Sequence, residues 1–119
     1  MNRYTIWQVL ADDPLVFREF AFCSLDRILE RHPAFRGGPD VLATLPREAW
    51  EAVYIYATDK EPSLDWLFTK FQRGGGSVPE DFYGHSMSVS DIIETPDGKL
   101  WFCDSLGWER VRWEERDAN

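Results

Sequence analysis

The order of apolar and polar positions along the chain predicts both strands and helices. Runs of β-branched and aromatic residues, alternating or unbroken, are typical of strands, whereas apolar residues three and four positions apart are typical of helices. The strand pattern occurs at 3–10, 16–22, 52–57, 86–93, 100–105 and 108–113. The helical pattern follows Ser24 and Ser63, so each serine is expected to cap a helix.

Two of the strand runs also predict their own place in a sheet. In 3–10 both alternating faces carry apolar or aromatic residues, which predicts a strand covered on both sides. The run 52–57 is almost continuously apolar, which favours a central strand. In 16–22, Phe20 and Phe22 alternate with a charged and a small residue, so this run is predicted to be a second strand.

Proline and glycine indicate where the elements end. Pro33 is expected to end the first helix at 31–32, and Gly74 to end the second. Pro46 is expected to begin a helical turn over 46–50. The segments 36–39 and 74–77 are predicted to be a loop and a flexible linker, and 114–119 a frayed polar tail.

The stretch 86–105 is predicted to be a β-hairpin. Pro96, Asp97 and Gly98 separate its two β-rich runs, and proline at the second turn position with glycine at the fourth favours a type I turn. Together these elements predict a single α+β domain over 1–119. It has a mostly antiparallel sheet of about five strands, with two main helices packed on one face.

The same stretch holds most of the residues that could carry chemistry. A hydrolytic triad requires a nucleophile, a base and an acid in contact, usually from separate elements, and no GxSxG motif is present. The residues are therefore interpreted as a structural motif, with Asp91 turned inward and hydrogen-bonded to nearby hydroxyls or amides. A small enzyme centred on His85 and Asp91 is the alternative. The motif consists of Gly84, His85, Ser86, Ser88, Ser90, Asp91, Asp104, Ser105 and Gly107.

Metal and redox chemistry find little support in the sequence. Cys23 and Cys103 lie 80 residues apart, and neither pairs with a histidine at the short spacing of zinc ligands. No metal and no cofactor are therefore expected. No apolar segment follows the first basic residue and no run is long enough to span a membrane, which predicts a cytoplasmic protein with reduced thiols.

The acidic balance of the chain restricts its partners. Asp and Glu number 21 against 13 Lys and Arg, so the net charge is −8. This charge disfavours direct binding to nucleic acid, and it either keeps the domain in solution or attracts a basic protein. The expected partner is therefore an unidentified basic protein, and the sequence sets no oligomeric state. Candidate interface residues are Asp12, Asp13, Glu80, Asp81, Trp108 and Trp113.

An acidic mimic of DNA that inhibits a restriction or CRISPR nuclease is a further alternative. Such a mimic needs a row of carboxylates with the spacing of phosphates. Basic residues interrupt most acidic stretches of this chain, as Arg18 and Lys60 do. A local acidic patch is therefore expected, not a surface with the length of a duplex.

Several blocks of the sequence resemble one known family. They are residues 4–9, 20–26, 53–54 and 67–71, the block GHSMSVSDII at 84–93 with Pro79 and 81–82 before it, and CDSLGW at 103–108. Over nearly the whole chain they are similar to the YodL-like domain of bacterial phages and integrative elements. The resemblance implies an accessory protein of a mobile element without an established activity. We therefore expect a non-catalytic interaction protein that acts against or alongside a host defence system.

Overall fold

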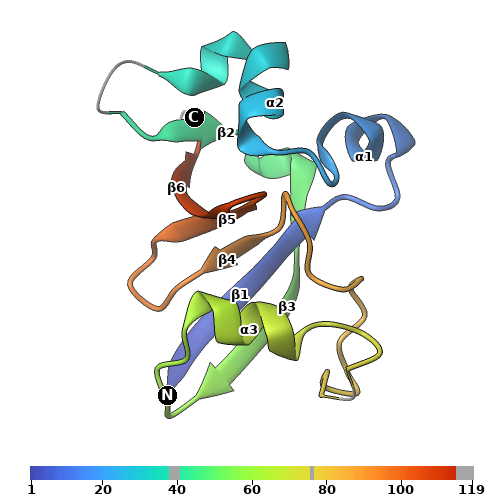
Figure 1. Cartoon of the computed structure of the whole chain (residues 1–119), viewed down its shortest axis with the longest axis vertical. Coiled ribbons are helices and arrows are strands. Elements are labelled where there is room, and N and C mark those ends of the chain that lie inside the picture. Colours follow the sequence, from blue (N-terminus) through green and yellow to red (C-terminus); the bar gives the residue numbers. More distant parts are fainter. Residues whose placement is uncertain (38–40, 76, 115–119) are drawn as a thin grey trace, which may run out of the picture.

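The computed structural model describes residues 1–37, 41–75 and 77–114. Within these residues, six strands form one sheet in the order β2-β6-β5-β4-β1-β3 (Figure 1). Neighbouring strands are antiparallel except β2 and β6, which are parallel. The mixed class and the mostly antiparallel sheet are thus confirmed. The strands are β1 (Asn2–Val9), β2 (Ala43–Leu45), β3 (Trp50–Thr58), β4 (Ile92–Glu94), β5 (Leu100–Asp104) and β6 (Gly107–Trp113).

Three α-helices accompany the sheet in the described part of the chain: α1 (Pro14–Phe20), α2 (Leu25–Arg31) and α3 (Leu64–Lys70). Both predicted caps are confirmed, because the Ser24 and Ser63 hydroxyls accept hydrogen bonds from backbone amides in the first turns of α2 and α3. The predicted turn near Pro46 is the 3₁₀ helix Arg47–Ala49, and another covers Pro33–Arg36. The prediction that Gly74 ends the helix capped by Ser63 was wrong, because α3 already ends at Lys70.

The helices cover both faces of the sheet, not one face as predicted. Trp7 and Val9 of β1 pack in one apolar cluster with Phe20 and residues of α2, whereas Tyr4 and Ile6 pack in a second cluster with α3. Figure 1 shows α3 lying over β1 and β3, away from α1 and α2. The reason is visible in β1: a strand with apolar side chains on both faces needs cover on both sides.

The prediction of a strand at 16–22 was wrong, because most of this segment is α1. Pro14 occupies the first position of the helix, and the Asp13 carboxylate accepts hydrogen bonds from the amides of Leu15 and Val16. An aspartate cap followed by proline is a strong helix start, and here it outweighs the short alternation of the phenylalanines.

The run predicted as a central strand lies instead at an edge of the sheet. β3 pairs with β1 alone among the described strands. Tyr54 and Tyr56 face the cluster beneath α3, whereas Ile55 is 57% exposed. The apolar side chains of β3 therefore indicate that one face of the strand is buried. They do not indicate whether a second strand pairs with its other edge.

The hairpin is confirmed, although it is shorter than predicted. The amide of Gly98 donates to the carbonyl of Thr95 at 2.9 Å, and Gly98 has a φ of 81°. Asp97 has a negative φ, which excludes a type II turn and agrees with the predicted type I turn. The first strand begins only at Ile92, so the predicted strand over 86–91 was wrong.

Some predictions concern residues outside the described ranges. The loop at 36–39 includes residues 38 and 39, the linker at 74–77 includes residue 76, and the tail at 114–119 is described only at Glu114. The predicted last strand is confirmed as β6. Of the helices in the described ranges, none is long and apolar enough to cross a membrane.

Candidate functional site

A buried glutamine binds the loop at 84–91, which carries most of the motif residues, to the sheet. Gln8 on β1 is 2% exposed, and its Nε2 donates to the carbonyl of His85 at 2.8 Å and to Oδ2 of Asp91 at 3.0 Å. Its Oε1 accepts from the amide of His85 at 3.2 Å. All three hydrogen bonds reach across more than seventy residues of sequence, so Gln8 fixes where the loop lies on β1.

Asp91 lies in the interior and is 0% exposed. Its Oδ2 also accepts from the backbone amide of Ser88 at 3.0 Å, while Oδ1 has no hydrogen-bond partner among the described residues. Burial raises the pKa of Asp91 to about 8, although the hydrogen bonds from Ser88 and Gln8 act to lower it. The carboxyl group is therefore largely neutral near pH 7, which suits a structural position.

Among the described residues His85 and Asp91 form no hydrogen bond with each other, and Gln8 bonds to both. The His85 Nδ1 is 2.7 Å from the carbonyl oxygen of Ser86, and a carbonyl only accepts, so Nδ1 carries the proton. In the described chain Nε2 has no hydrogen-bond partner. The ring packs against Phe22 with centroids 5.4 Å apart. A relay from carboxylate to histidine is thus not assembled here.

Two residues that hydrogen-bond to each other, Phe22 and Ser90, adopt left-handed backbone angles. Phe22 has a φ of 63° and Ser90 a φ of 86°, and the amide of Phe22 donates to the Ser90 hydroxyl at 3.0 Å. The indole of Trp50 donates to the carbonyl of Ser90 at 2.9 Å. Such angles are unfavourable for residues other than glycine and persist only where the surroundings hold them. Their result is that Phe22, 55% exposed, stands at the surface beside His85.

An arginine that the sequence reading overlooked holds the same loop from its other side. The Arg73 side chain donates to the carbonyls of Gly84, at 2.8 Å, and Phe82, and its backbone amide donates to the Ser86 hydroxyl at 2.7 Å. Its guanidinium also lies over the ring of Phe82. Arg73 follows α3, so it connects that helix to the wall of the site.

An open pocket of about 520 Å³ lies beside His85. We call it the Tyr83 pocket, because Tyr83 lines it and is 89% exposed. Ala11, just before Asp12 and Asp13, and Glu51 of β3 also line it. Three segments that are distant in the sequence therefore meet here. The candidate acidic residues are exposed and lie close to lining residues in the sequence: Asp12 and Asp13 follow Ala11, and Glu80 and Asp81 precede Tyr83.

The two tryptophans proposed as candidate interface residues, Trp108 and Trp113, are both half-buried. Trp113 is half-buried, with its ring 5.2 Å from Trp7 and 5.9 Å from Trp50. Trp108 is half-buried and donates its indole N–H to Asp65 at 2.9 Å. Both lie in β6, where the sheet and its neighbours cover them. The exposed aromatic side chains are Phe22, Trp66 and Tyr83.

The remaining motif residues lie at the far end of the hairpin. The Asp104 carboxylate accepts from the amides of Ser105 and Leu25, so it connects β5 to the start of α2. Gly107 has a φ of 134°, a conformation that favours glycine. This group is separate from the Tyr83 pocket and stabilises the packing of α2 on the sheet.

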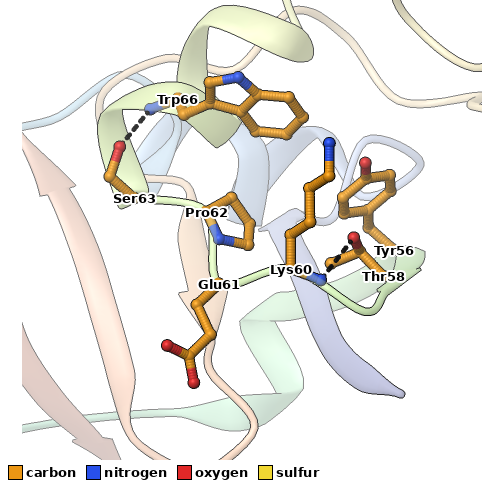
Figure 2. Close-up of a pocket in the computed structure, with 7 residues that line it drawn as sticks. All are labelled: Tyr56, Thr58, Lys60, Glu61, Pro62, Ser63 and Trp66. Atoms are coloured by element: carbon orange, nitrogen blue, oxygen red, sulfur yellow. Dashed lines mark hydrogen bonds between the residues drawn. The ribbon is translucent and has the colours of Figure 1, made fainter.

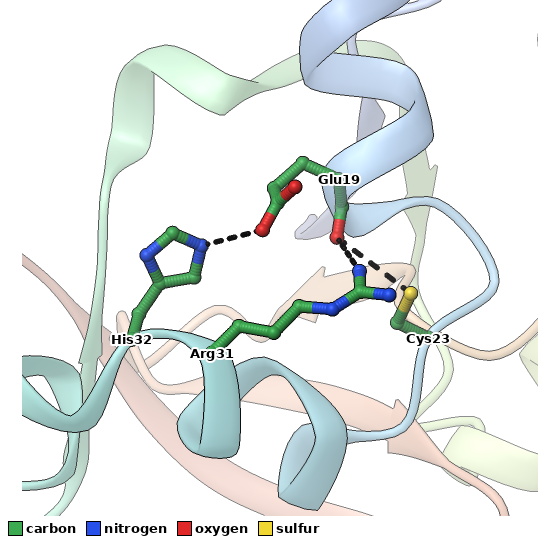
Figure 3. Close-up of polar contacts among 4 residues, drawn as sticks. All are labelled: Glu19, Cys23, Arg31 and His32. Atoms are coloured by element: carbon green, nitrogen blue, oxygen red, sulfur yellow. Dashed lines mark hydrogen bonds and ion pairs between the residues drawn. The ribbon is translucent and has the colours of Figure 1, made fainter.

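A polar cluster between α1 and α2 holds the remaining histidine and one cysteine (Figure 3). The His32 ring is 2.9 Å from the Glu19 carboxylate, while Arg31 and the thiol of Cys23 both donate to the Glu19 carbonyl. Within the described ranges, no three His, Cys, Asp or Glu side chains gather as a metal site would require. Burial raises the pKa of Cys103 to about 12, with nearby Asp91 contributing, so this thiol stays protonated.

A second pocket, of about 370 Å³, lies between the end of β3 and α3 (Figure 2). We call it the Trp66 pocket. Tyr56, Thr58 and Lys60 line it together with the indole of Trp66. The Lys60 side chain extends toward the two aromatic rings, and Glu61 points away from them.

The family model described as the YodL-like domain matches residues 3–113. No curated protein and no solved structure matches the chain.

Proposed function

The chain belongs to the YodL-like domain family, and we propose that it is a non-catalytic protein that binds a basic segment of another protein at the Tyr83 pocket. The setting we propose is the cytoplasm of a bacterium that carries a phage or mobile element. There the partner is a host or element-encoded protein of a defence system. The sequence resemblance described above motivates this setting.

The observation that carries the proposal is the composition of the Tyr83 pocket. An 89% exposed tyrosine, the half-exposed Phe22 next to His85 and the exposed carboxylate of Glu51 gather at one place. Exposed aromatic side chains are enriched at protein interfaces, and charges around them steer association and choose the partner. The nearby acidic residues favour a partner with lysine and arginine.

The charge of the chain favours a protein over nucleic acid as the partner. A net charge of −8 repels phosphate backbones. The Glu51 carboxylate at the Tyr83 pocket suits a short basic segment, whereas a DNA mimic needs a row of carboxylates along the molecule.

Capture of the partner from a host lysate with the tagged chain tests the proposal. Replacing Glu80 and Asp81 by Gln and Asn should slow association with the captured protein more than it speeds dissociation. Added salt should weaken binding, because exposed charges are screened beyond about 10 Å at 0.1 M. The matched control removes two exposed charges of α2, Asp26→Asn with Glu30→Gln. Equal binding by both double variants, together with indifference to salt, would refute the acidic surface as the site.

A second candidate function is a small enzyme in which His85 transfers a proton. The favouring observation is that His85 lines the Tyr83 pocket with the proton on Nδ1, and that Nε2 has no hydrogen-bond partner among the residues the structure describes. Against it, none of the described residues lining that pocket is a serine, threonine or cysteine, so a nucleophile beside His85 is not in place. A panel of ester and phosphoester substrates decides: turnover lost in His85→Gln supports the enzyme, and equal background rates exclude it for these substrates.

A further inference from the structure

The outer edge of β3 is open for pairing with another strand. β3 has nine residues and, in the part of the chain that the structure describes, a strand on one side only. Alternate residues of an edge strand direct N–H and C=O groups away from the sheet. Trp50–Thr58 contains no proline, lysine or arginine, the residues that commonly protect such edges.

The geometry of the edge is regular over its second half. The pairing of β3 with β1 shifts between Ile6 and Trp7, which leaves Val53 as an extra residue on β3. From Tyr54 to Thr58 each residue pairs in register with β1. This half therefore presents a straight ladder of backbone groups, and Ile55 beside it is 57% exposed.

β3 contributes residues to both pockets, and the two pockets differ in charge. The Tyr83 pocket includes Glu51 and Val53 from the start of β3, and the Trp66 pocket includes Tyr56 and Thr58 from its end. The first is lined by the exposed carboxylate of Glu51. The second has aromatic walls with Lys60 extending toward them, while its Glu61 points away, so the two ends of β3 favour opposite charges (Figure 2).

The Trp66 pocket suits a carboxylate attached to a short aliphatic stem. Trp66 is 48% exposed, and its ring centroid is 6.1 Å from that of Tyr56. The Lys70 ammonium lies 5.6 Å and 5.7 Å from the two ring centroids, and Lys60 lines the same pocket (Figure 2). The Lys60 ammonium can pair with a carboxylate whose aliphatic stem lies on the two rings.

We propose that β3 takes up an extended segment of the partner as an additional antiparallel strand. This proposal rests on the proposed function, and it adds the mode of binding and the sequence of the segment. In antiparallel pairing, the amino-terminal end of the segment lies beside the carboxyl-terminal end of β3. The segment therefore begins with an acidic residue at the Trp66 pocket and ends with basic residues at the Tyr83 pocket.

The length of the segment follows from the spacing of strands. From Ala52 to Thr58, a strand rising about 3.3 Å per residue extends about 20 Å, which an extended peptide of about seven residues covers. β-Branched residues at its centre suit pairing with Tyr54–Thr58. A second copy of the chain is disfavoured as the occupant, because each copy carries a charge of −8 and the extra residue at Val53 bends part of the edge.

Binding of a labelled probe peptide to the full chain tests this arrangement. The probe is fluorescein-Glu-Val-Thr-Val-Thr-Lys-Arg, measured by fluorescence anisotropy, with the reversed sequence as its control. We expect the probe to bind at least about fivefold more tightly than its reverse, because reversal puts like charges at both pockets. Equal affinity of the two peptides, or no binding of either, would overturn the proposal.

The backbone pairing itself is tested by N-methylation at alternate residues. One set of alternate amides of the probe faces β3 and the other faces solvent. Methylating the first set should abolish binding, whereas methylating the second should leave it intact. Hydrogen exchange of amides in Tyr54–Thr58 should slow when the probe binds. Binding that tolerates both sets of methyl groups would show contact through side chains only, against the proposal.

A charge exchange assigns the acidic end of the segment. Lys60→Glu should weaken binding of the probe by about fivefold. A probe that begins with lysine in place of glutamate should restore the lost affinity for this variant. Arg27→Glu, an exposed charge reversal on α2, is the matched control, and it should not shift the preference between the two probes. A partner whose binding depends on Glu80 and Asp81 could leave the β3 amides unprotected from hydrogen exchange. That result would overturn strand addition and leave the proposed function standing.

Discussion

Replacing Asp91 by asparagine isolates the pH dependence that a buried carboxyl group gives to the fold. Burial raises its pKa in the folded protein to about 8, whereas the ordinary value is 3.8. Between these values the folded state binds more protons than the unfolded state, so the free energy of unfolding falls as the pH rises. The fall is at most about 1.4 kcal/mol per pH unit, or about 4 kcal/mol between pH 5 and pH 8.

The asparagine variant should lack this fall. Its amide oxygen can accept the hydrogen bonds from Gln8 and Ser88 that Oδ2 accepts now. Its NH₂ group takes the place of Oδ1, which has no partner among the described residues, at a cost of about 1–3 kcal/mol. The variant should therefore be less stable than the original protein near pH 5 and more stable near pH 8.5.

Urea unfolding followed by fluorescence of the six tryptophans, from pH 5 to pH 9, measures both proteins. The decisive quantity is the difference between their free energies of unfolding at each pH, because all other titrating groups are common to both. Asp97→Asn is the control, since hydrogen bonds from Thr95 and Lys99 lower the pKa of this exposed carboxylate out of the range. A difference that stays constant with pH would refute the raised pKa of Asp91.

Two further predictions concern packing and thiol chemistry. Gly84→Ala should lower the free energy of unfolding by about 1–3 kcal/mol, because a Cβ there would stand 2.5 Å from Oε1 of Gln8. Gly75→Ala, where the nearest atom is 3.4 Å away, is its control in urea unfolding at pH 6, and equal midpoints would contradict the crowding. Iodoacetamide at pH 8 should modify Cys23 well before Cys103, whose pKa burial raises to about 12. Peptide mapping by mass spectrometry checks this, and equal labelling of both thiols in the folded protein would contradict it.

The features that local chemistry decides could be predicted from the sequence. Ser24 and Ser63 cap their helices because a hydroxyl and the amides it bonds lie within four residues. The turn at Pro96–Gly98 is equally local. The prediction for 16–22 failed because its apolar positions fit both the period of a strand and the period of a helix. Asp13 and Pro14 favour the helix, and they were interpreted only as a break.

The position of β3 could not be read in the same way. Side chains report which faces of a strand are covered, whereas the order of strands depends on hydrogen bonds in the plane of the sheet. Tyr54 and Tyr56 would be apolar partners of α3 in a central strand or at an edge. The sequence therefore predicted the strand correctly and its neighbours incorrectly.

Part of the candidate site was predictable, since Asp91 stands before an apolar run and a buried carboxyl group requires donors. The main donor, Gln8, was missed, although it shares a face with Tyr4 and Ile6 and a polar residue in such a series needs a buried partner. Arg73 gave no signal, because its partners are backbone carbonyls. The left-handed angle of Ser90 also has no sequence signature in a serine, so the segment before Ile92 was mistaken for a strand.

These departures from local rules gather in one place, and that location favours function over chance. Phe22 and Ser90 each hold an angle that costs about 1–3 kcal/mol, and they hydrogen-bond to each other beside His85. A sequence selected for stability alone would place glycine at such positions. Here the strain leaves Phe22 exposed at the side of the Tyr83 pocket, while Trp50 fixes Ser90 from the core. Natural proteins keep local conflicts of this kind chiefly where a site requires them, so the pocket, and not the covered tryptophans of β6, is the surface to probe for a partner.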